Sequence, residues 1–258
     1  MEQHEYSNRE KIDIMLLEGY STRVKWQRAM RYAFFALLTV AIWGAYFTWR
    51  PPGPTLRLRH VTHWGDKPVV SLTFDDGPHP LMTPLLLAAL KRTGVKATFF
   101  VVGDGLRLYP ELAYRMVHDG HVLANHSQYH FNLTRISPAE YEHEIQNCFS
   151  AIRHVYKSAG LKPNDSKLFR PPGGGLNRAA MDYLYRNDVT LAWWSNNVGD
   201  WARPPAWKVW RGVSDTLQPG DIILLHDAGV GTPQAIPGIV KSARRRGLSF
   251  QPMPEAQP

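Results

Sequence analysis

Short apolar runs alternate with longer amphipathic stretches along most of this chain, from about residue 69 onward. Short runs of this kind are typical of buried strands, and the stretches between them carry apolar residues at helical spacing. Parallel strands need a crossover, usually a helix, so the alternation predicts an α/β fold with one parallel sheet. The expected strands are 69–74, 97–102, 121–125, 167–170, 190–194 and 221–226, and the expected helices are 81–92, 110–119, a long one after 137, 178–186, 206–216 and one ending near 246.

The N-terminal part of the chain has a different character. Residues 32–49 carry no charged side chain, and as a helix at ~1.5 Å per residue they span about 27 Å, close to the hydrocarbon thickness of a bilayer. Aromatic residues at both ends of this segment suit the membrane interfaces. We therefore expect a transmembrane signal anchor over 25–50 that contacts the membrane through 32–49; a buried core helix is the alternative.

This anchor divides the chain into parts. A tail over 1–24 precedes it, and a linker over 51–66 follows it, where "PPGP" favours a stiff exit. Residues 67–258 are then expected to form one folded domain. Basic residues flank the span on both sides, so the positive-inside rule gives only a weak preference for an inside N-terminus. The expectation is a single-pass protein with its folded domain outside the cytoplasm.

Composition narrows the classes of function. The formal net charge of +8 divides evenly between residues 1–68 and the remainder, so no basic stripe forms and we expect no nucleic-acid partner. A single cysteine, Cys148, excludes an internal disulfide and any site with several cysteine ligands.

Five polar motifs follow the expected strands. In a β/α barrel the C-terminal ends of the strands share one rim, so side chains from distant parts of the sequence converge there. The motifs are "DDGP" from 75, "HSQYH" over 126–130, "RPPGGG" from 170, "GDW" over 199–201, and the histidine at 226 that ends "DIILLH". We expect them to form one site.

The paired aspartates at 75 and 76 need an explanation, because adjacent like charges repel. A cation would supply one: one aspartate binds it, and the other, pointing the opposite way, takes a proton. His126 and His130 are four residues apart, so on a helical turn they would share a face and complete a two-histidine, one-carboxylate set. Singly, each motif also suits a turn, a surface loop or a satisfied histidine. Together they favour a catalytic metal site.

In order and spacing, "TFDDGP", "HSQYH", "RPPGG", "GDW" and "LLH" resemble the motifs of the polysaccharide deacetylases with a NodB-type domain, carbohydrate esterase family 4. "KATFFVVG" and "NHSQYHFNL" are similar too, and the resemblance covers roughly residues 67–252. It implies a distorted (β/α) barrel of the NodB type, with the deacetylase domain over 67–258. It also implies metal-assisted hydrolysis of N-acetyl groups on sugars, with peptidoglycan or a chitin-like oligosaccharide as the expected substrate.

The resemblance further implies roles for single residues. Asp75 would be the general base and His226 the general acid. Arg170 would orient the base, and Asp200 would hold the acid histidine. The implied metal ligands are Asp76, His126 and His130; the implied oxyanion donor is the backbone N–H of Gly173, and Trp201 and Leu224 would line the acetyl pocket. One divalent ion is expected, with zinc favoured by two imidazoles and a carboxylate, and Co²⁺, Ni²⁺ or Mn²⁺ as alternatives.

Some features leave the substrate open. Gly173 stands where family members often carry tyrosine, and Asn197 where many carry an acidic residue, so substrate preference is expected to differ. Five tryptophans cluster in the sequence, and sugar stacking and core filling explain them equally well. They are Trp193, Trp194, Trp201, Trp207 and Trp210. The alternative functions are deacylation of O-acetylated or lipid-linked sugars, and an inactive metal-containing carbohydrate-binding domain.

Overall fold

The computed structural model describes residues 30, 60–65, 67–162 and 165–253. The chain divides into two units, 1–55 and 56–258. The helices of the described residues are all too short or too polar to span a bilayer. The tail predicted over 1–24 lies outside the described residues, and so does the anchor predicted over 25–50 apart from Met30.

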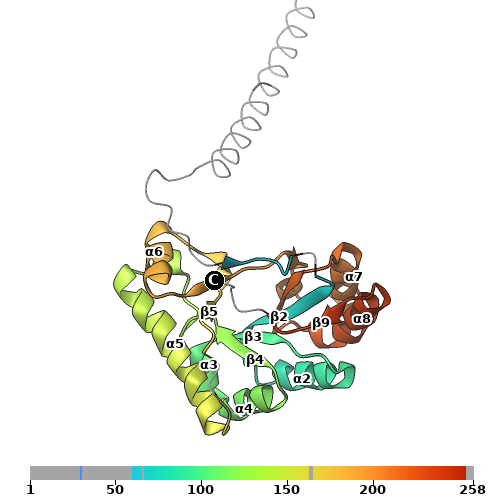
Figure 1. Cartoon of the computed structure of the whole chain (residues 1–258), viewed down its shortest axis with the longest axis horizontal. Coiled ribbons are helices and arrows are strands. Elements are labelled where there is room, and N and C mark those ends of the chain that lie inside the picture. The colour runs from blue at the N-terminus through green and yellow to red at the C-terminus, as the bar shows by residue number, and fades with distance from the viewer. Residues whose placement is uncertain (1–29, 31–59, 66, 163–164, 254–258) are drawn as a thin grey trace, which may run out of the picture. The chain divides into compact units, whose positions relative to one another are not determined.

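One parallel sheet forms the centre of the second unit (Figure 1). Its strand order is β1-β6-β5-β4-β3-β2-β8-β7, and β9 pairs with the start of β2. The strands are β1 His60–Val61, β2 Val69–Gly77, β3 Thr98–Val101, β4 Val122–Asn125, β5 Leu168–Phe169, β6 Thr190–Ala192, β7 Asn196–Asn197, β8 Ile222–His226 and β9 Ser249–Phe250. All neighbouring strands in this part of the chain pair in parallel, so the predicted α/β class is confirmed.

The sheet curls so that its ends approach each other. β6 and β7 lie near opposite ends of the strand order, yet only residues 193–195 separate them in sequence. At ~3.5 Å per residue this connection reaches at most about 14 Å. Within it the Trp193 N–H donates to Val61 O on β1 at 2.8 Å, and the Ser195 N–H donates to Ile222 O on β8 at 3.0 Å. The sheet is therefore a curled half-barrel, the form expected of a distorted β/α barrel.

Helices cover the outer face of this sheet (Figure 1). They are α2 Met82–Thr93, α3 Gly103–Leu108, α4 Pro110–His118, α5 Pro138–Ser158, α6 Arg178–Arg186, α7 Ala206–Thr216 and α8 Thr232–Arg245, with short 3₁₀ helices η1 Leu133–Arg135, η2 Pro172–Gly174 and η3 Asp200–Ala202. The predicted start of α5 is confirmed: Glu140 Oε2 accepts the Ser137 N–H at 2.7 Å, which closes a capping box. Helix α3 was not predicted, because six residues with two glycines carry little helical periodicity.

Strand β2 separates apolar from polar side chains. Val70, Leu72 and Phe74 belong to the main core between the sheet and its helices. Residues 71, 73 and 75 alternate onto the concave face, where they are buried but polar. This alternation places the carboxylate of Asp75 inside the curl of the sheet.

Strand β1 lies within the range predicted to be a linker. His60 and Val61 pair with Leu191 and Ala192 of β6. His60 and Val61, within the range 51–66 predicted as a linker, therefore belong to the sheet, and residues 51–59 and 66 of that range lie outside the described residues. A strand of two residues has no periodicity from which the sequence could reveal it.

Asp227 directly follows β8, is fully buried, and forms a side-chain hydrogen bond with α2. Its Oδ2 accepts a hydrogen bond from Thr83 Oγ1 at 2.6 Å, whereas its Oδ1 has no partner in the described part of the chain. Burial raises the pKa of Asp227 to about 7, and the hydrogen bonds from Thr83 and His79 offset only part of this effect.

This raised pKa predicts a pH-dependent stability. Between about pH 4 and pH 7 the folded chain holds a proton that the unfolded chain has released, so the free energy of unfolding should fall as pH rises through this window. Asp227→Asn, which does not ionise, should reduce the difference in unfolding free energy between pH 5 and pH 8 by roughly 1–4 kcal/mol. Urea denaturation at both pH values measures this difference in unfolding free energy. Asp215→Asn is the control, because Asp215 is exposed. An unchanged difference in Asp227→Asn would contradict the assignment.

Candidate active site

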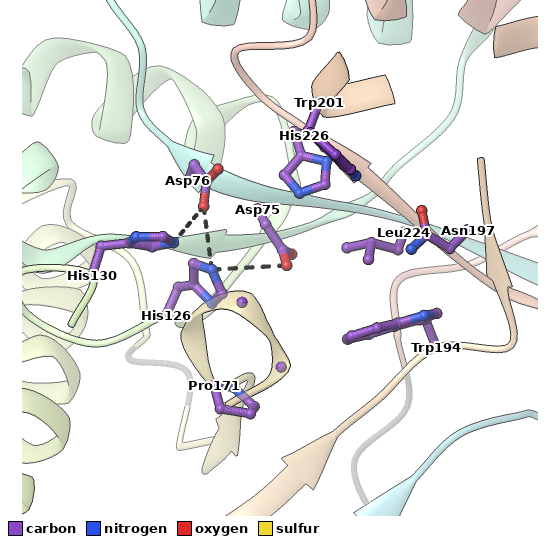
Figure 2. Close-up of a pocket in the computed structure, with 12 residues that line it drawn as sticks. Asp75, Asp76, His126, His130, Pro171, Trp194, Asn197, Trp201, Leu224 and His226 are labelled. Atoms are coloured by element: carbon purple, nitrogen blue, oxygen red, sulfur yellow. Dashed lines mark ion pairs between the residues drawn. The ribbon is translucent and has the colours of Figure 1, made fainter. Parts of the chain in front are cut away.

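A cavity of about 380 Å³ lies at the C-terminal ends of the strands (Figure 2). Eight of the ten residues singled out in the sequence line it: Asp75, Asp76, His126, His130, Gly173, Trp201, Leu224 and His226. The other two, Arg170 and Asp200, are buried and contact Asp75 and His226. Pro171, Gly174, Trp194 and Asn197 complete the lining. The fold thus brings together the five motifs that the sequence places far apart.

Both paired aspartates face this cavity. Neighbours in a strand normally point to opposite faces, and the sequence predicted such a divergence. A bulge prevents it: the pairing of β2 with β3 shifts register between Asp75 and Gly77, and Asp76 has a φ of 73°. The aspartates differ instead in their surroundings, because Asp75 is buried and Asp76 is exposed.

The segment 126–130 is a loop, so the helical turn predicted for the two histidines is wrong. Ser127 and His130 adopt positive φ values of 69° and 62°. Side chains stabilise this shape: Asn125 Oδ1 accepts the Ser127 N–H at 2.8 Å, and Ser127 Oγ accepts the His130 N–H at 2.9 Å. The loop still places the two imidazoles together, with ring centroids 5.0 Å apart.

Glu144 on α5 also holds this loop, and the sequence did not indicate it. Its side chain is only 2% exposed, and its Oε2 accepts the Tyr129 N–H at 3.0 Å. The available signal was a charged residue on the buried face of a helix, beside Tyr141, Ile145 and Cys148.

Asp76, His126 and His130 fit a divalent metal ion. One ligand atom from each lies within 4.8 Å of the others, and Asp76 Oδ1 is 3.2 Å from His126 Nε2 and 3.0 Å from His130 Nε2. Bonds of about 2.1 Å in tetrahedral geometry place donor atoms roughly 3.4 Å apart. His126 Nδ1 lies 2.7 Å from the Arg170 carbonyl, which can only accept, so this nitrogen carries the proton and Nε2 is free to bind metal.

Charge at these groups follows from their contacts. Burial acts to raise the pKa of Asp76, but its hydrogen bonds and ion pairs with His126 and His130 outweigh burial and hold that pKa well below its usual range. The hydrogen bond to Asp76 raises the pKa of His130, with burial opposing it. A negative carboxylate between two imidazoles makes this part of the cavity attractive to a cation.

Arg170 fixes the second carboxylate. Its side chain is fully buried, and its guanidinium donates to Asp75 Oδ1 at 2.7 Å and to Thr73 Oγ1 at 2.8 Å. It also donates to the Trp193 carbonyl at 2.9 Å, and its central carbon lies 3.9 Å from the centre of the Phe100 ring. The Asp75 carboxylate is thus oriented by a buried cation that is itself held by Thr73, the Trp193 carbonyl and the Phe100 ring.

Asp200 fixes His226 in the same way. His226 Nδ1 lies 2.7 Å from Asp200 Oδ1, and Asp200 Oδ2 accepts the His226 N–H at 2.9 Å and the Thr232 hydroxyl at 2.6 Å. Because a carboxylate accepts, Nδ1 is the donor and Nε2 is left for the cavity. Burial acts to lower the pKa of His226, but Asp200 outweighs burial and raises it, which favours an imidazolium that can give up a proton.

The remaining wall combines glycines and aromatic rings. Gly173 has a φ of 61°, and its N–H has no hydrogen-bond partner among the described residues, whereas the next two amides bond to the carbonyls of Pro171 and Pro172. Of the five clustered tryptophans, Trp194 and Trp201 line the cavity. Trp194 stacks on Trp193 with ring centroids 4.5 Å apart, and Trp201 is 66% exposed.

Comparison with known proteins finds deacetylases of sugars among the relatives of this chain. The sequence profile of the polysaccharide deacetylase family matches residues 64–192. The chitooligosaccharide deacetylase of Bradyrhizobium sp. is 34% identical over 200 residues, covering 72% of this chain and 89% of the relative.

Solved structures resemble the fold. A peptidoglycan N-acetylglucosamine deacetylase in complex with 4-naphthalen-1-yl-N-oxidanyl-benzamide superposes with a TM-score of 0.72 at 27% identity, covering 81% of this chain and 97% of that one. A family 4 carbohydrate esterase from Streptomyces lividans in complex with acetate superposes with a TM-score of 0.63 at 34% identity, covering 70% and 91%.

The burial of Arg170 predicts a large stability effect. Arg170→Met leaves Asp75 as an unpaired buried charge, so the free energy of unfolding at pH 7 should fall by about 3–5 kcal/mol. Adding Asp75→Asn removes that charge and should recover part of the loss. Urea denaturation measures both, with Arg178→Met as control because its ion pair with Asp182 is exposed and worth under about 1 kcal/mol. Equal losses in Arg170→Met and Arg178→Met would contradict the role given to the buried pair.

Proposed function

Because the chain belongs to the polysaccharide deacetylase family, we propose that it hydrolyses the N-acetyl groups of N-acetylated sugars to acetate and free amino sugars. One observation carries the proposal: three donor atoms within 4.8 Å of one another lie beside a carboxylate held by Arg170 and a histidine held by Asp200. Asp75 Oδ2 is 3.9 Å from His126 Nε2, so base and ligands share one small space. Each group needed for amide hydrolysis is therefore in reach of the same cavity.

Asp76, His126 and His130 would hold the divalent ion, which when bound supplies Lewis-acid activation of the acetamide carbonyl and of a water molecule. Zinc suits two imidazoles and a carboxylate, and Co²⁺, Ni²⁺ or Mn²⁺ could replace it. The donor set favours this group of metals over calcium or magnesium, which prefer oxygen ligands.

The chain's own residues then move the protons. Asp75 takes a proton from the attacking water as the oxygen of that water bonds to the acetyl carbon. The Gly173 N–H donates to the developing oxyanion. His226 gives its Nε2 proton to the sugar nitrogen as the carbon–nitrogen bond breaks. Arg170 and Asp200 keep the base and the acid in place throughout.

The substrate class is proposed from the relatives. Two of them are a chitooligosaccharide deacetylase and a peptidoglycan N-acetylglucosamine deacetylase, so a polymer that contains N-acetylglucosamine is the substrate we propose for this chain. Gly173 and Asn197 both line the cavity, so they are positioned to adjust preference among such polymers. Assays on O-acetylated sugars and on lipid-linked sugars separate this function from deacylation of those targets.

Asp75→Asn tests the reaction. The variant should reduce kcat for N-acetylglucosamine oligomers by on the order of 10²–10⁴, because it removes the base and keeps the shape. Its zinc affinity, measured by chelator competition, should match that of the unchanged protein, since Asp75 is outside the proposed ligand set. Acetate release should also stop after chelation and return with added metal.

Two results would overturn these assignments. Near-normal turnover in Asp75→Asn with zinc still bound would show that Asp75 is not the general base. Metal binding without acetate release in the unchanged protein would favour an inactive carbohydrate-binding domain.

We also propose that residues 32–49 anchor the chain in a membrane with residues 56–258 outside the cytoplasm. Eighteen residues without charge support the anchor, and a cell-wall polymer as substrate supports the outside location. The full chain should stay with membranes after alkaline carbonate extraction, and protease added to spheroplasts should degrade residues 56–258. Release by carbonate, or protection from protease, would contradict the anchor or its orientation.

A further inference from the structure

The buried carboxylate of Asp200 receives a hydrogen bond from a residue that the proposed reaction does not yet use. Thr232, the first residue of α8, is fully buried, and its hydroxyl donates to Asp200 Oδ2 at 2.6 Å. The other two hydrogen bonds of Asp200 come from His226, whose Nδ1 lies 2.7 Å from Oδ1 and whose backbone N–H donates to Oδ2 at 2.9 Å. Asp200 is therefore held from two elements, the end of β8 and the start of α8.

The place of Thr232 at a helix start does not explain this contact. A threonine hydroxyl at the start of a helix commonly accepts a backbone N–H of the first turn. The N-cap residue of α8 is Gly231, and none of the described side chains caps this helix. The Thr232 hydroxyl gives its proton to Asp200 instead. Its direction points to a role at the partner of the proposed general acid.

The loop between His226 and Thr232 brings the hydroxyl to Asp200. The Gly229 N–H donates to His226 O at 3.0 Å, and the Thr232 N–H donates to Gly229 O at 3.1 Å, so two turns follow one another. A Cβ atom at Gly229 would clash with Thr232 Oγ1 and would lie 2.7 Å from Asp200 Oδ2. The loop can thus pass over this contact only with glycine at position 229. Close packing on this side favours the observed placement of the hydroxyl.

The orientation of Asp200 decides how His226 can act. A general acid at this position needs its proton on Nε2, toward the cavity, and therefore needs Nδ1–H held by the carboxylate. A carboxylate can turn about its Cβ–Cγ bond unless its second oxygen is held as well. Thr232 holds that oxygen from an element other than the one that carries His226. A hydrogen bond to a charged group is also stronger than one between neutral groups.

We propose that Thr232 is a positioning residue for the general acid: its hydroxyl keeps Asp200 in the orientation that holds the His226 ring with Nε2 toward the cavity. This inference rests on the proposed function and makes its proton-donating step more specific. Thr232 acts through Asp200, because it is fully buried and does not line the cavity.

Thr232→Val tests the hydroxyl, because valine has nearly the shape of threonine and has no proton to donate. With N-acetylglucosamine oligomers, kcat should fall about three- to tenfold, as expected for one lost hydrogen bond, and KM should not change. Thr232→Ser keeps the hydroxyl and should recover most of kcat. Thr190→Val is the matched control, because Thr190 of β6 is also buried and does not line the cavity; its kcat should not change. Thr232→Ala, which also lacks the hydroxyl, serves if the valine variant does not fold.

Proton NMR of the full chain with isotope-labelled histidine supplies a readout that does not need turnover. The His226 Nδ1 proton lies in a short hydrogen bond to a carboxylate, so its signal is expected downfield of the amide protons. Loss of this signal in Asp200→Asn assigns it. In Thr232→Val the signal should broaden or move upfield, and in Thr232→Ser it should keep its position.

Two results would overturn the inference. One is an unchanged kcat with an unchanged His226 signal in Thr232→Val. The other is an equal loss of kcat in Thr232→Val and Thr232→Ser with the signal unchanged, which would indicate only a disturbed start of α8. Absence of acetate release by the unchanged protein would refute the proposed function, and the His226 signal would then decide on Thr232 by itself.

Discussion

The buried guanidinium of Arg170 is the contact on which the site depends. Its side chain joins the inner face of β2 to the end of β6, since it donates to Thr73, Asp75 and the carbonyls of Ala192 and Trp193. Its own carbonyl accepts from His126, which selects the tautomer able to bind metal. A single residue thereby orients both the proposed base and one proposed ligand. Five donors in a planar fork make arginine suited to such a position, and a lysine could not replace these bonds.

The same arrangement is used twice around the cavity. Asp75 is a carboxylate held by a buried cation, and His226 is an imidazole held by a buried carboxylate. In both, the partner lies behind the working group and away from the cavity. The working atoms thus reach the cavity with their orientation and charge already set, which is what general base and general acid roles require.

Much of the fold follows from patterns that the sequence displays. Helices α6 and α7 have the predicted bounds because apolar periodicity marks both, and in α6 the Asn177 side chain also caps the first turn. The ten site residues converge because the rim of a parallel sheet collects the residues that follow each strand. What the sequence did not reveal depends on contacts distant in the chain. The bulge at Asp76 needs the register of β3, the loop after His126 needs Glu144 of α5, and β1 needs the edge of β6. No local pattern encodes such contacts.

The connection of residues 193–195 gives the two ends of the curled sheet a shared constraint. Trp193 bonds to β1 and to Arg170, Ser195 bonds to β8, and Trp194 between them lines the cavity. An insertion here would widen the cavity, weaken the hydrogen bonding of Arg170 that orients the base, and separate the edge strand β1 from the sheet. Adaptation of the site to bulkier or slimmer glycans should accordingly preserve the length of this tripeptide and act on the segments around Gly173 and Trp201.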